Sequence, residues 1–418
     1  MCRVRFPIEL PEDARPAVEI VRRLADAGQT ALLAGGCVRD LLLGHRPKDY
    51  DVATDAPPGR ICRLFRRTRR VGAQFGVVLV RKRGRWIEGA TFRTDGQYSD
   101  GRRPDEVHFS DAAHDAYRRD FTINGMFLDP LAGELIDYVG GQADLRAALI
   151  RAIGDPARRF AEDHLRLLRA VRFAARLGFT IETQTLEAIR AHAADLRRVA
   201  AERIREELER ILRHTNRHRG VALLEETGLL AYLWAGARWS QEQLATAQRV
   251  LAALPAACSF ELPLAVLLAD RSTGEAASMC RALACSNDQR DRLVWLIAHQ
   301  RDLDDPETPT LAQLKRLMAH AAFGDLRTWA EVRYDDFPDG DQRRAALARR
   351  IASIPRAAIQ PPPLVSGEDL LAAGVPPGPV YAQVLDALYT AQLDERIRTR
   401  DQALALLRQL LREKGETP

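Results

Sequence analysis

Cysteine, lysine and long apolar runs are all scarce in this chain of 418 residues. Six cysteines are scattered without a Cys-x-x-Cys pair, which argues against a zinc site and against a disulfide framework. No stretch approaches the ~20 apolar residues that a membrane helix needs. The N-terminal segment carries acids and prolines where a secretory signal would be apolar. We therefore expect a cytoplasmic protein without a membrane partner.

Positive charge is carried almost entirely by arginine, because only residues 48, 82, 315 and 414 are lysine. The net charge of +5 permits a nucleic-acid partner without requiring one. The preference for arginine could reflect a GC-rich genome. It could also reflect binding of phosphate groups. The length suggests two to four domains, and nothing in the composition indicates an oligomeric state.

The apolar pattern changes along the chain. Before residue 142 it mixes short alternating runs with amphipathic ones, which predicts an α+β domain with a small mixed sheet of about five strands. After residue 142, apolar residues recur with a 3.6-residue period, which predicts an all-α remainder. The expected strands are 30–34, 50–54, 76–81, 85–92 and 106–109, and the expected early helices are 8–28, 37–43, 57–67 and 112–128.

Two glycines and two aspartates form the first group of candidate residues. Gly35 and Gly36 end a predicted strand and open a helix, so their backbone N–H groups could approach a phosphate that Arg39 also reaches. Asp49 and Asp51 are two apart on the next strand, so both carboxylates would point to one face. A lone Asp-x-Asp is common on surfaces. Following a glycine pair, it favours Mg²⁺ binding and phosphoryl transfer.

Further acids and arginines are less specific on their own. Glu88 could come beside the aspartates on a neighbouring strand as a third catalytic carboxylate, or could face solvent paired with an arginine. The run Arg118 to Asn124 could simply be a helix start capped by a salt bridge. The pair His114-Asp115 stands alone, and we interpret it as structural.

An aspartate and three arginines form the last group. Asp163, Arg166, Arg169 and Arg172 are spaced by three, so they would line one face of a helix. Such a stripe is usually a solvated surface, but apolar faces flank it here, which favours a cleft. Cytosine and adenine each present an amino donor beside a ring-nitrogen acceptor. Asp163 and Arg166, one helical turn apart, could pair with C or A but not with U or G.

In order and spacing these groups resemble one family. GGCVRDLLLG with KDYDVAT, then RRDFTIN, then EDHLRLLRAVRFAARLGF, resemble the motifs of class II tRNA nucleotidyltransferases and bacterial poly(A) polymerases. The resemblance covers residues 30–215, and AERIREELERIL (201–212) resembles the family's next helical motif. The segment SGEDLLAAGVPPGPVYAQVLDAL resembles the tail of tRNA CCA-adding enzymes. Gly125 departs from the alanine or serine usual in the family.

The resemblance implies four domains: a nucleotidyltransferase head (1–141), a helical neck that recognises the base (142–215), a helical body (216–355) and a helical tail that binds tRNA (356–418). It implies that Asp49 and Asp51 bind Mg²⁺ and act in catalysis, with Glu88 beside them. It further implies nucleotide-binding roles for residues of all three motifs, which are Gly35, Gly36, Arg39, Arg119, Asp120, Asn124, Asp163, Arg166, Arg169 and Arg172.

The activity that the resemblance implies is template-independent addition of C and A, from CTP and ATP, to the 3′ end of tRNA with release of pyrophosphate. An enzyme that adds only A, a poly(A) polymerase and a catalytically silent RNA-binding protein remain alternatives. The segment from Phe92 to Asp105 resembles a family loop whose presence argues against an enzyme that adds only C. Intact Asp49 and Asp51 argue against a silent protein.

Overall fold

The computed structural model describes residues 2–6, 9–71, 76–96, 107–234, 236–372 and 379–413. The chain divides into two compact units. The first comprises Met1–Ser240 with Ala282–Ala284, and the second comprises Gln241–Arg281 with Cys285–Pro418. The four domain borders expected from the sequence are finer than this division and stay predictions.

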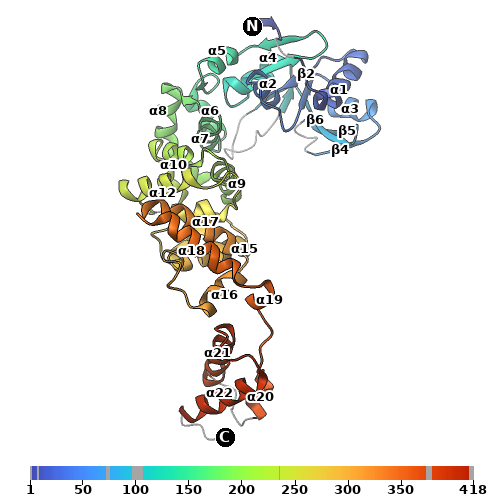
Figure 1. Cartoon of the computed structure of the whole chain (residues 1–418). Helices are drawn as coiled ribbons and strands as arrows, with labels where there is room; N and C mark the ends of the chain where they lie inside the picture. Colours follow the sequence, from blue (N-terminus) through green and yellow to red (C-terminus); the bar gives the residue numbers. More distant parts are fainter. Residues whose placement is uncertain are drawn as a thin grey trace. The chain divides into compact units, whose positions relative to one another are not determined.

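An eight-stranded mixed sheet forms the N-terminal part of the first unit (Figure 1). Its order is β1-β10-β9-β2-β3-β6-β5-β4, and of its neighbouring pairs only β3 and β6 run parallel. Two smaller sheets pair β7 with β8 and β11 with β12. The strands are β1 (Cys2–Arg5), β2 (Ala31–Ala34), β3 (Asp51–Thr54), β4 (Thr68–Arg70), β5 (Val77–Lys82), β6 (Arg85–Thr91), β7 (Arg93–Asp95), β8 (Val107–Phe109), β9 (Met126–Asp129), β10 (Glu134–Asp137), β11 (Leu149–Ile150) and β12 (Thr180–Ile181).

The expected α+β head is confirmed, with more strands than the sequence predicts. Strand β9 overlaps the end of the helix predicted over 112–128. That prediction is wrong beyond Tyr117, where α4 (Ala112–Tyr117) ends. The apolar run of β9 is buried between β2 and β10, and so short a run cannot be distinguished from a buried helix by its period. The helix predicted over 8–28 is shorter, because Pro16 lies in the first turn of α1 (Arg15–Asp26).

The two faces of the large sheet are covered unequally. Helices α1 and α3 (Pro58–Leu64) pack on one face, where valines and isoleucines of β3, β5 and β6 form the main core (Figure 1). On the other face a smaller core around Phe127 includes residues of α4 and lies toward β2, β9 and β10. Asp51 and Glu88 project from the less covered part of this second face, and Glu88 is exposed.

The rest of the first unit is helical, but with a break inside the third motif. Helix α6 (Pro156–Glu162) ends at Asp163, whose backbone is extended, and α7 (Arg166–Leu177) begins three residues later. The prediction that Asp163 and Arg166 share one helix is therefore wrong. Asp163 Oδ1 accepts the Leu165 N–H at 3.1 Å, a local bond that competes with helix formation. The remaining helices are α2 (Gly36–Leu42), α5 (Gly141–Arg146), α8 (Thr183–His192), α9 (Ala201–Leu212), α10 (Arg217–Glu226) and α11 (Leu230–Leu233).

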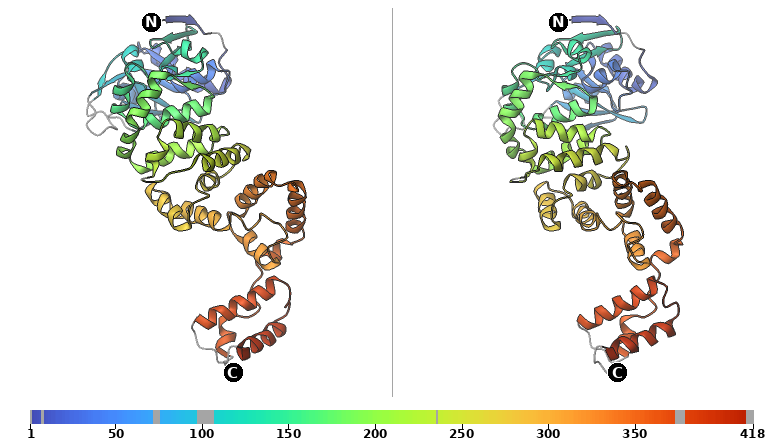
Figure 2. Two further views of the ribbon diagram at one scale, coloured as in Figure 1. Left: turned by 90° about the vertical axis from the view of Figure 1, so that its left-hand side faces the viewer. Right: turned by 60° about the vertical axis from the view of Figure 1, so that its left-hand side comes forward.

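The second unit is helical, as the sequence predicts. Its last helices, red in Figure 2, enclose a core that includes Leu370, Val384 and Leu407. Residues 373–378 of the tail-like segment and 97–106 of the family-like loop lie outside the described residues. Across the described ranges, no helix is long and apolar enough to cross a membrane. The helices are α12 (Gln241–Ala253), α13 (Glu261–Leu267), α14 (Thr273–Ala282), α15 (Asn287–His299), α16 (Leu311–Ala319), α17 (Phe323–Arg333), α18 (Gly340–Ala352), α19 (Arg356–Ile359), α20 (Gly367–Ala372), α21 (Pro379–Leu393) and α22 (Arg400–Glu413).

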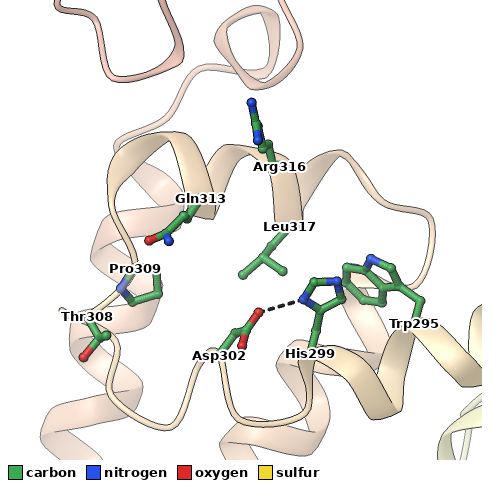
Figure 3. Close-up of a pocket in the computed structure, with 8 residues that line it drawn as sticks. All are labelled: Trp295, His299, Asp302, Thr308, Pro309, Gln313, Arg316 and Leu317. Atoms are coloured by element: carbon green, nitrogen blue, oxygen red, sulfur yellow. Dashed lines mark hydrogen bonds and ion pairs between the residues drawn. The ribbon is translucent and has the colours of Figure 1, made fainter. Parts of the chain in front are cut away.

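A cavity of about 370 Å³ lies beside α15 and α16 in the second unit (Figure 3). Its polar side chains already have partners within the unit. His299 Nδ1 lies 2.7 Å from Asp302, and Arg316 donates to Asp386 at 2.6 Å. Trp295 stacks on the ring of His320, with the ring centroids 3.9 Å apart. The side chains that line this cavity are therefore engaged in contacts within their own unit.

Candidate active site

The first motif forms a tight turn between β2 and α2. Gly35 has a φ of +73°, a conformation that favours glycine. A Cβ at Gly35 would lie 2.7 Å from Arg119 Nη1, so the absence of a side chain lets that arginine approach the start of α2. Gly36 is the first residue of α2. The Gly35 N–H donates to the Met126 carbonyl at 3.2 Å. The N–H groups from Gly36 onward, at the start of α2, and the Arg119 guanidinium come together here, an arrangement suited to an anion.

Asp51 and Glu88 are neighbours on adjacent strands. Val52 pairs with Gly89 in parallel register, so the residues before them lie side by side on one face. Burial, then the charge of Glu88, raises the pKa of Asp51 from 3.8 to about 6, while Arg119 lowers it. Two carboxylates held this close repel each other unless a cation lies between them.

Asp49 is less closely associated with Asp51 than the sequence predicts. It precedes β3, is exposed, and lines a separate hollow with Asp13 and Trp86. Its charge is the smallest of the four causes that act on the pKa of Asp51. Among the residues that the structure describes, no three His, Cys, Asp or Glu side chains are grouped closely enough to hold a metal ion. The structure thus joins Asp51 to Glu88 more directly than to Asp49.

A polar cavity of about 470 Å³ adjoins Asp51 in the first unit. Seven arginines and three aspartates line it, so guanidinium groups dominate the lining, although carboxylates behind the wall pair with several of them. The positive charge of the arginines and their bidentate geometry suit a triphosphate. Of the residues predicted for the site, only Asp49 and Glu88 lie outside the lining, which comprises Gly35, Gly36, Arg39, Asp51, Arg118, Arg119, Asp120, Asn124, Asp163, Arg166, Arg169, Arg172, Phe173 and Arg176.

A buried carboxylate holds two arginines of the cavity. Asp115 is 1% exposed and accepts hydrogen bonds from Arg119 Nη2 at 2.9 Å and from Arg118 Nε at 2.8 Å. Burial alone would raise the pKa of Asp115, but the two guanidinium groups hold it below 3.8. Arg119 also lies over the Phe127 ring, 5.1 Å from its centroid. Its orientation toward the glycine turn is therefore fixed from several sides.

Asp120 connects the second motif to α7. One of its carboxylate oxygens accepts from Arg169 at 2.9 and 2.6 Å, and the other accepts from Asn124 at 3.0 Å. Burial opposes ionisation, but Arg169 and Asn124 keep the pKa of Asp120 far below its usual value. Asn124 in turn accepts from Arg39 at 2.6 Å, and Arg39 is itself bonded to Asp40. These residues form a continuous buried network along one wall of the cavity.

Asp163 and Arg166 face the cavity from the break between α6 and α7. Asp163 Oδ2 accepts from Arg203 of α9 at 3.1 Å. Arg166 bonds to Glu162 at 2.9 Å and to the backbone carbonyls of residues 159 and 118 at 3.0 and 3.1 Å. Within the described residues, these bonds leave the Arg166 Nε–H and one Nη2–H unused. Both residues therefore keep free hydrogen-bonding capacity at the cavity wall.

An aromatic ring and a buried glutamate support the other arginines of α7. Arg172 lies over the Phe173 ring at 4.1 Å from its centroid, and Arg169 lies over the same ring at 5.4 Å. Glu207 of α9 is 1% exposed and accepts from Arg172 Nε at 2.5 Å. Burial lowers the pKa of Arg172 to about 10, although Glu207 opposes the change. The guanidinium groups are therefore preorganised before any ligand arrives.

Comparisons with known proteins match this geometry. The Poly A polymerase head domain matches residues 31–151, and the probable RNA and SrmB-binding site of polymerase A matches residues 178–236. The CCA-adding enzyme of Levilactobacillus brevis is 35% identical over 391 residues, 91% of this chain and 93% of that protein. The CCA-adding enzyme of Geobacillus stearothermophilus is 35% identical over 405 residues, 96% of this chain and 98% of that protein.

This chain belongs to the CCA-adding enzyme family. The crystal structure of the Bacillus stearothermophilus CCA-adding enzyme in complex with CTP matches the fold with a TM-score of 0.81 at 30% identity, covering 97% of this chain and all of that one. The expected family, fold class and enzyme class, a nucleotidyltransferase, are thereby confirmed. Nucleotidyltransferases of this family generally use divalent metal ions.

Gly125 is the departure from the CCA-adding pattern that the structure explains. A Cβ at this position would lie 2.6 Å from Val139 Cγ2 and 3.2 Å from Ile153 Cδ1. The valine and isoleucine fill the space that a methyl group would need. A side chain at this position would therefore require Val139 or Ile153 to move.

Sequence reasoning missed several residues of the site. Arg118, Phe173 and Arg176 line the cavity, and Arg176 could have been found by continuing the three- and four-residue spacing beyond Arg172. Glu207 lies in the segment 201–212, for which the sequence predicts a helix but no contact with an arginine of the site. Asp115 was interpreted as structural, and its contact with Arg119 becomes visible only when α4 and the following turn are folded.

Proposed function

We propose that this chain adds C and A nucleotides to the 3′ end of tRNA, from CTP and ATP and without a template, in the cytoplasm. The observation that carries the proposal is a single cavity that combines Asp51, seven arginines and Asp163. The relatives named as CCA-adding enzymes, one of them solved with CTP, support it.

The carboxylates of Asp51 and Glu88 are the proposed protein ligands of Mg²⁺, with Asp49 nearby in the chain; Mg²⁺ usually takes only one or two carboxylates and completes its shell with substrate phosphates and water. Hard oxygen donors that repel one another, with the pKa of Asp51 raised to about 6, fit a divalent cation better than any other partner. Bound there, Mg²⁺ would act as a Lewis acid that neutralises phosphate charge and acidifies the 3′-hydroxyl.

The arginines of the cavity are proposed to hold the triphosphate. Arg119 and the backbone at Gly36 form one side, and Arg39, held by Asn124 and Asp40, lines the same cavity. This arrangement would keep the α-phosphorus in line with the attacking 3′-hydroxyl, and the positive wall would stabilise the departing pyrophosphate.

Base selection is assigned to Asp163 and Arg166. The Asp163 carboxylate can accept a hydrogen bond from the amino group that cytosine and adenine share, and the hydrogen bond from Arg203 orients it. Arg166 can donate through the Nε–H that its other contacts leave unused. Uracil and guanine would present an oxygen to Asp163 and an N–H to Arg166, so neither bond could form.

A pyrophosphate-release assay tests the proposal directly. Protein, Mg²⁺, CTP, ATP and a tRNA that ends before CCA should together release pyrophosphate. Omission of protein, Mg²⁺, tRNA or CTP should abolish the release, and omission of ATP should leave only the pyrophosphate from the C additions. Asp51→Asn should lose the activity, while Asp55→Asn, an exposed acid just beyond β3, should keep it. No release by the wild-type protein would instead favour a catalytically silent RNA-binding protein.

A further inference from the structure

The second face of the large sheet continues beyond the carboxylates toward its β4 edge. The registers of β3, β6, β5 and β4 place Asp51, Glu88, Leu79 and Arg69 in one row across this face. Asp51 and Arg69 are thus three strand spacings apart, or about 14 Å. The surface at β4 is therefore part of the same face as the proposed catalytic centre.

The next row on this face carries a tryptophan and two arginines. Trp86 pairs with Arg81, and the Arg81 N–H donates to the Arg67 carbonyl at 2.9 Å. The residues Trp86, Arg67, Arg69 and Arg81 are here called the β4 platform. Trp86 is 36% exposed, so part of its indole is open to solvent.

Two guanidinium groups lie against the indole ring of Trp86. The Arg69 guanidinium lies 4.4 Å from the ring centroid, and that of Arg81 lies 5.9 Å from it. Cation–π contacts of this kind hold an arginine side chain flat and leave its N–H edges free for a planar or tetrahedral anion. Trp86 therefore acts as a support for two outward-facing cations.

The arginines of the β4 platform lack carboxylate partners within the part of the chain that the structure describes. Among the described residues, no carboxylate forms an ion pair with Arg67, Arg69 or Arg81. The nearby Lys82 and Arg83 differ, because both pair with Glu19, at 3.2 and 2.6 Å. Exposed Arg66 and Arg70 add to the same edge. Such a cluster without carboxylate partners favours an anionic polymer over a neutral surface.

We propose that the β4 platform binds the phosphodiester backbone of the RNA strand whose 3′ end is extended. The inference rests on the proposed function, because it identifies where the incoming strand lies. A strand with its terminal hydroxyl at Asp51 can cross the open face past Glu88 and bring its preceding phosphates onto Arg69 and Arg81. Contacts with phosphates alone would accept any sequence, which suits a strand whose last nucleotides change with each addition.

Charge-matched variants test the platform. Arg69→Gln combined with Arg81→Gln removes two cations from it, and Arg22→Gln combined with Arg63→Gln removes two exposed cations from helices on the opposite face. For each protein, the KM for tRNA ending before CCA, the KM for CTP, and the salt dependence of tRNA binding by fluorescence anisotropy are measured. Thermal unfolding verifies that all variants fold.

The platform variant should raise the KM for tRNA and leave the KM for CTP unchanged. Its slope of log binding constant against log salt should be shallower than that of the wild-type protein by about 1.4, or about 0.7 for each lost phosphate contact on a single strand. Trp86→Ala should weaken tRNA binding in the same direction, and Trp86→Phe should restore it, because a phenyl ring can also support the guanidinium groups.

Two results would overturn the inference while leaving the proposed function intact. One is an active platform variant whose salt slope equals that of the wild-type protein. The other is an equal change of slope in the platform variant and the Arg22 and Arg63 control. Absence of nucleotide addition by the wild-type protein would instead contradict the proposed function itself.

Discussion

Replacing Asp51 with asparagine should stabilise the metal-free protein. Folding raises the pKa of Asp51 from 3.8 to about 6, so the ionised carboxylate is less favourable in the folded state than in the unfolded chain. Below pH 3.8 both states are protonated and there is no penalty. Above pH 6 the folded state carries the full penalty, roughly 3 kcal/mol at about 1.36 kcal/mol per pH unit. Asparagine has the same shape without the charge.

Chemical denaturation in the presence of a chelator measures this effect. The free energy of unfolding of Asp51→Asn should exceed that of the wild-type protein by about 3 kcal/mol at pH 8 and by about half as much at pH 5. Added Mg²⁺ should stabilise the wild-type protein more than the variant and reduce the difference, since Asp51→Asn removes one of the carboxylates that attract the cation. Equal stabilities at pH 8, or a larger gain at pH 5 than at pH 8, would refute the reasoning.

Three further predictions concern the cavity. Asp163→Ala should lose discrimination against UTP and GTP, and competition assays with labelled nucleotides measure it; unchanged selectivity would remove its base-reading role. Asp115→Asn should raise the KM for CTP and ATP roughly tenfold, because Arg119 loses a charged hydrogen-bond partner; steady-state kinetics that show an unaltered KM would contradict this. Asp120→Asn should leave Arg169 with only the more distant Glu207 carboxylate, at 4.0 Å, and lower the free energy of unfolding by ~1–3 kcal/mol, as urea denaturation would measure; an unchanged free energy of unfolding would show the pair to be dispensable.

Local patterns in the sequence predicted much of the site. The glycine pair predicted a turn with backbone available to an anion, and the turn has a positive φ at Gly35 that lets Arg119 approach. The sequence allowed Glu88, on a neighbouring strand, to lie beside the aspartates or to face solvent, and the parallel register of β3 and β6 places it beside Asp51. These inferences needed only the period of a strand and the conformational freedom of glycine.

Other features depend on contacts between distant segments. The spacing of three between the arginines gives no sign that the helix is broken at Asp163. At the break, the Asp163 side chain accepts a hydrogen bond from the Leu165 N–H, which competes with helix formation. The roles of Asp115 and Glu207 follow from partners in folded space. Strand β9 was mistaken for helix because burial on both sides removes the alternation that reveals a strand.

Sequencing the 3′ ends of the products tests the central claim most directly, namely that one protein cavity selects C and then A without a template. Wild-type protein given CTP, ATP and tRNA that ends before CCA should produce ends that read CCA and stop there. Ends that carry only a single A, or a long run of A, would contradict the claim and favour an A-adding enzyme or a poly(A) polymerase.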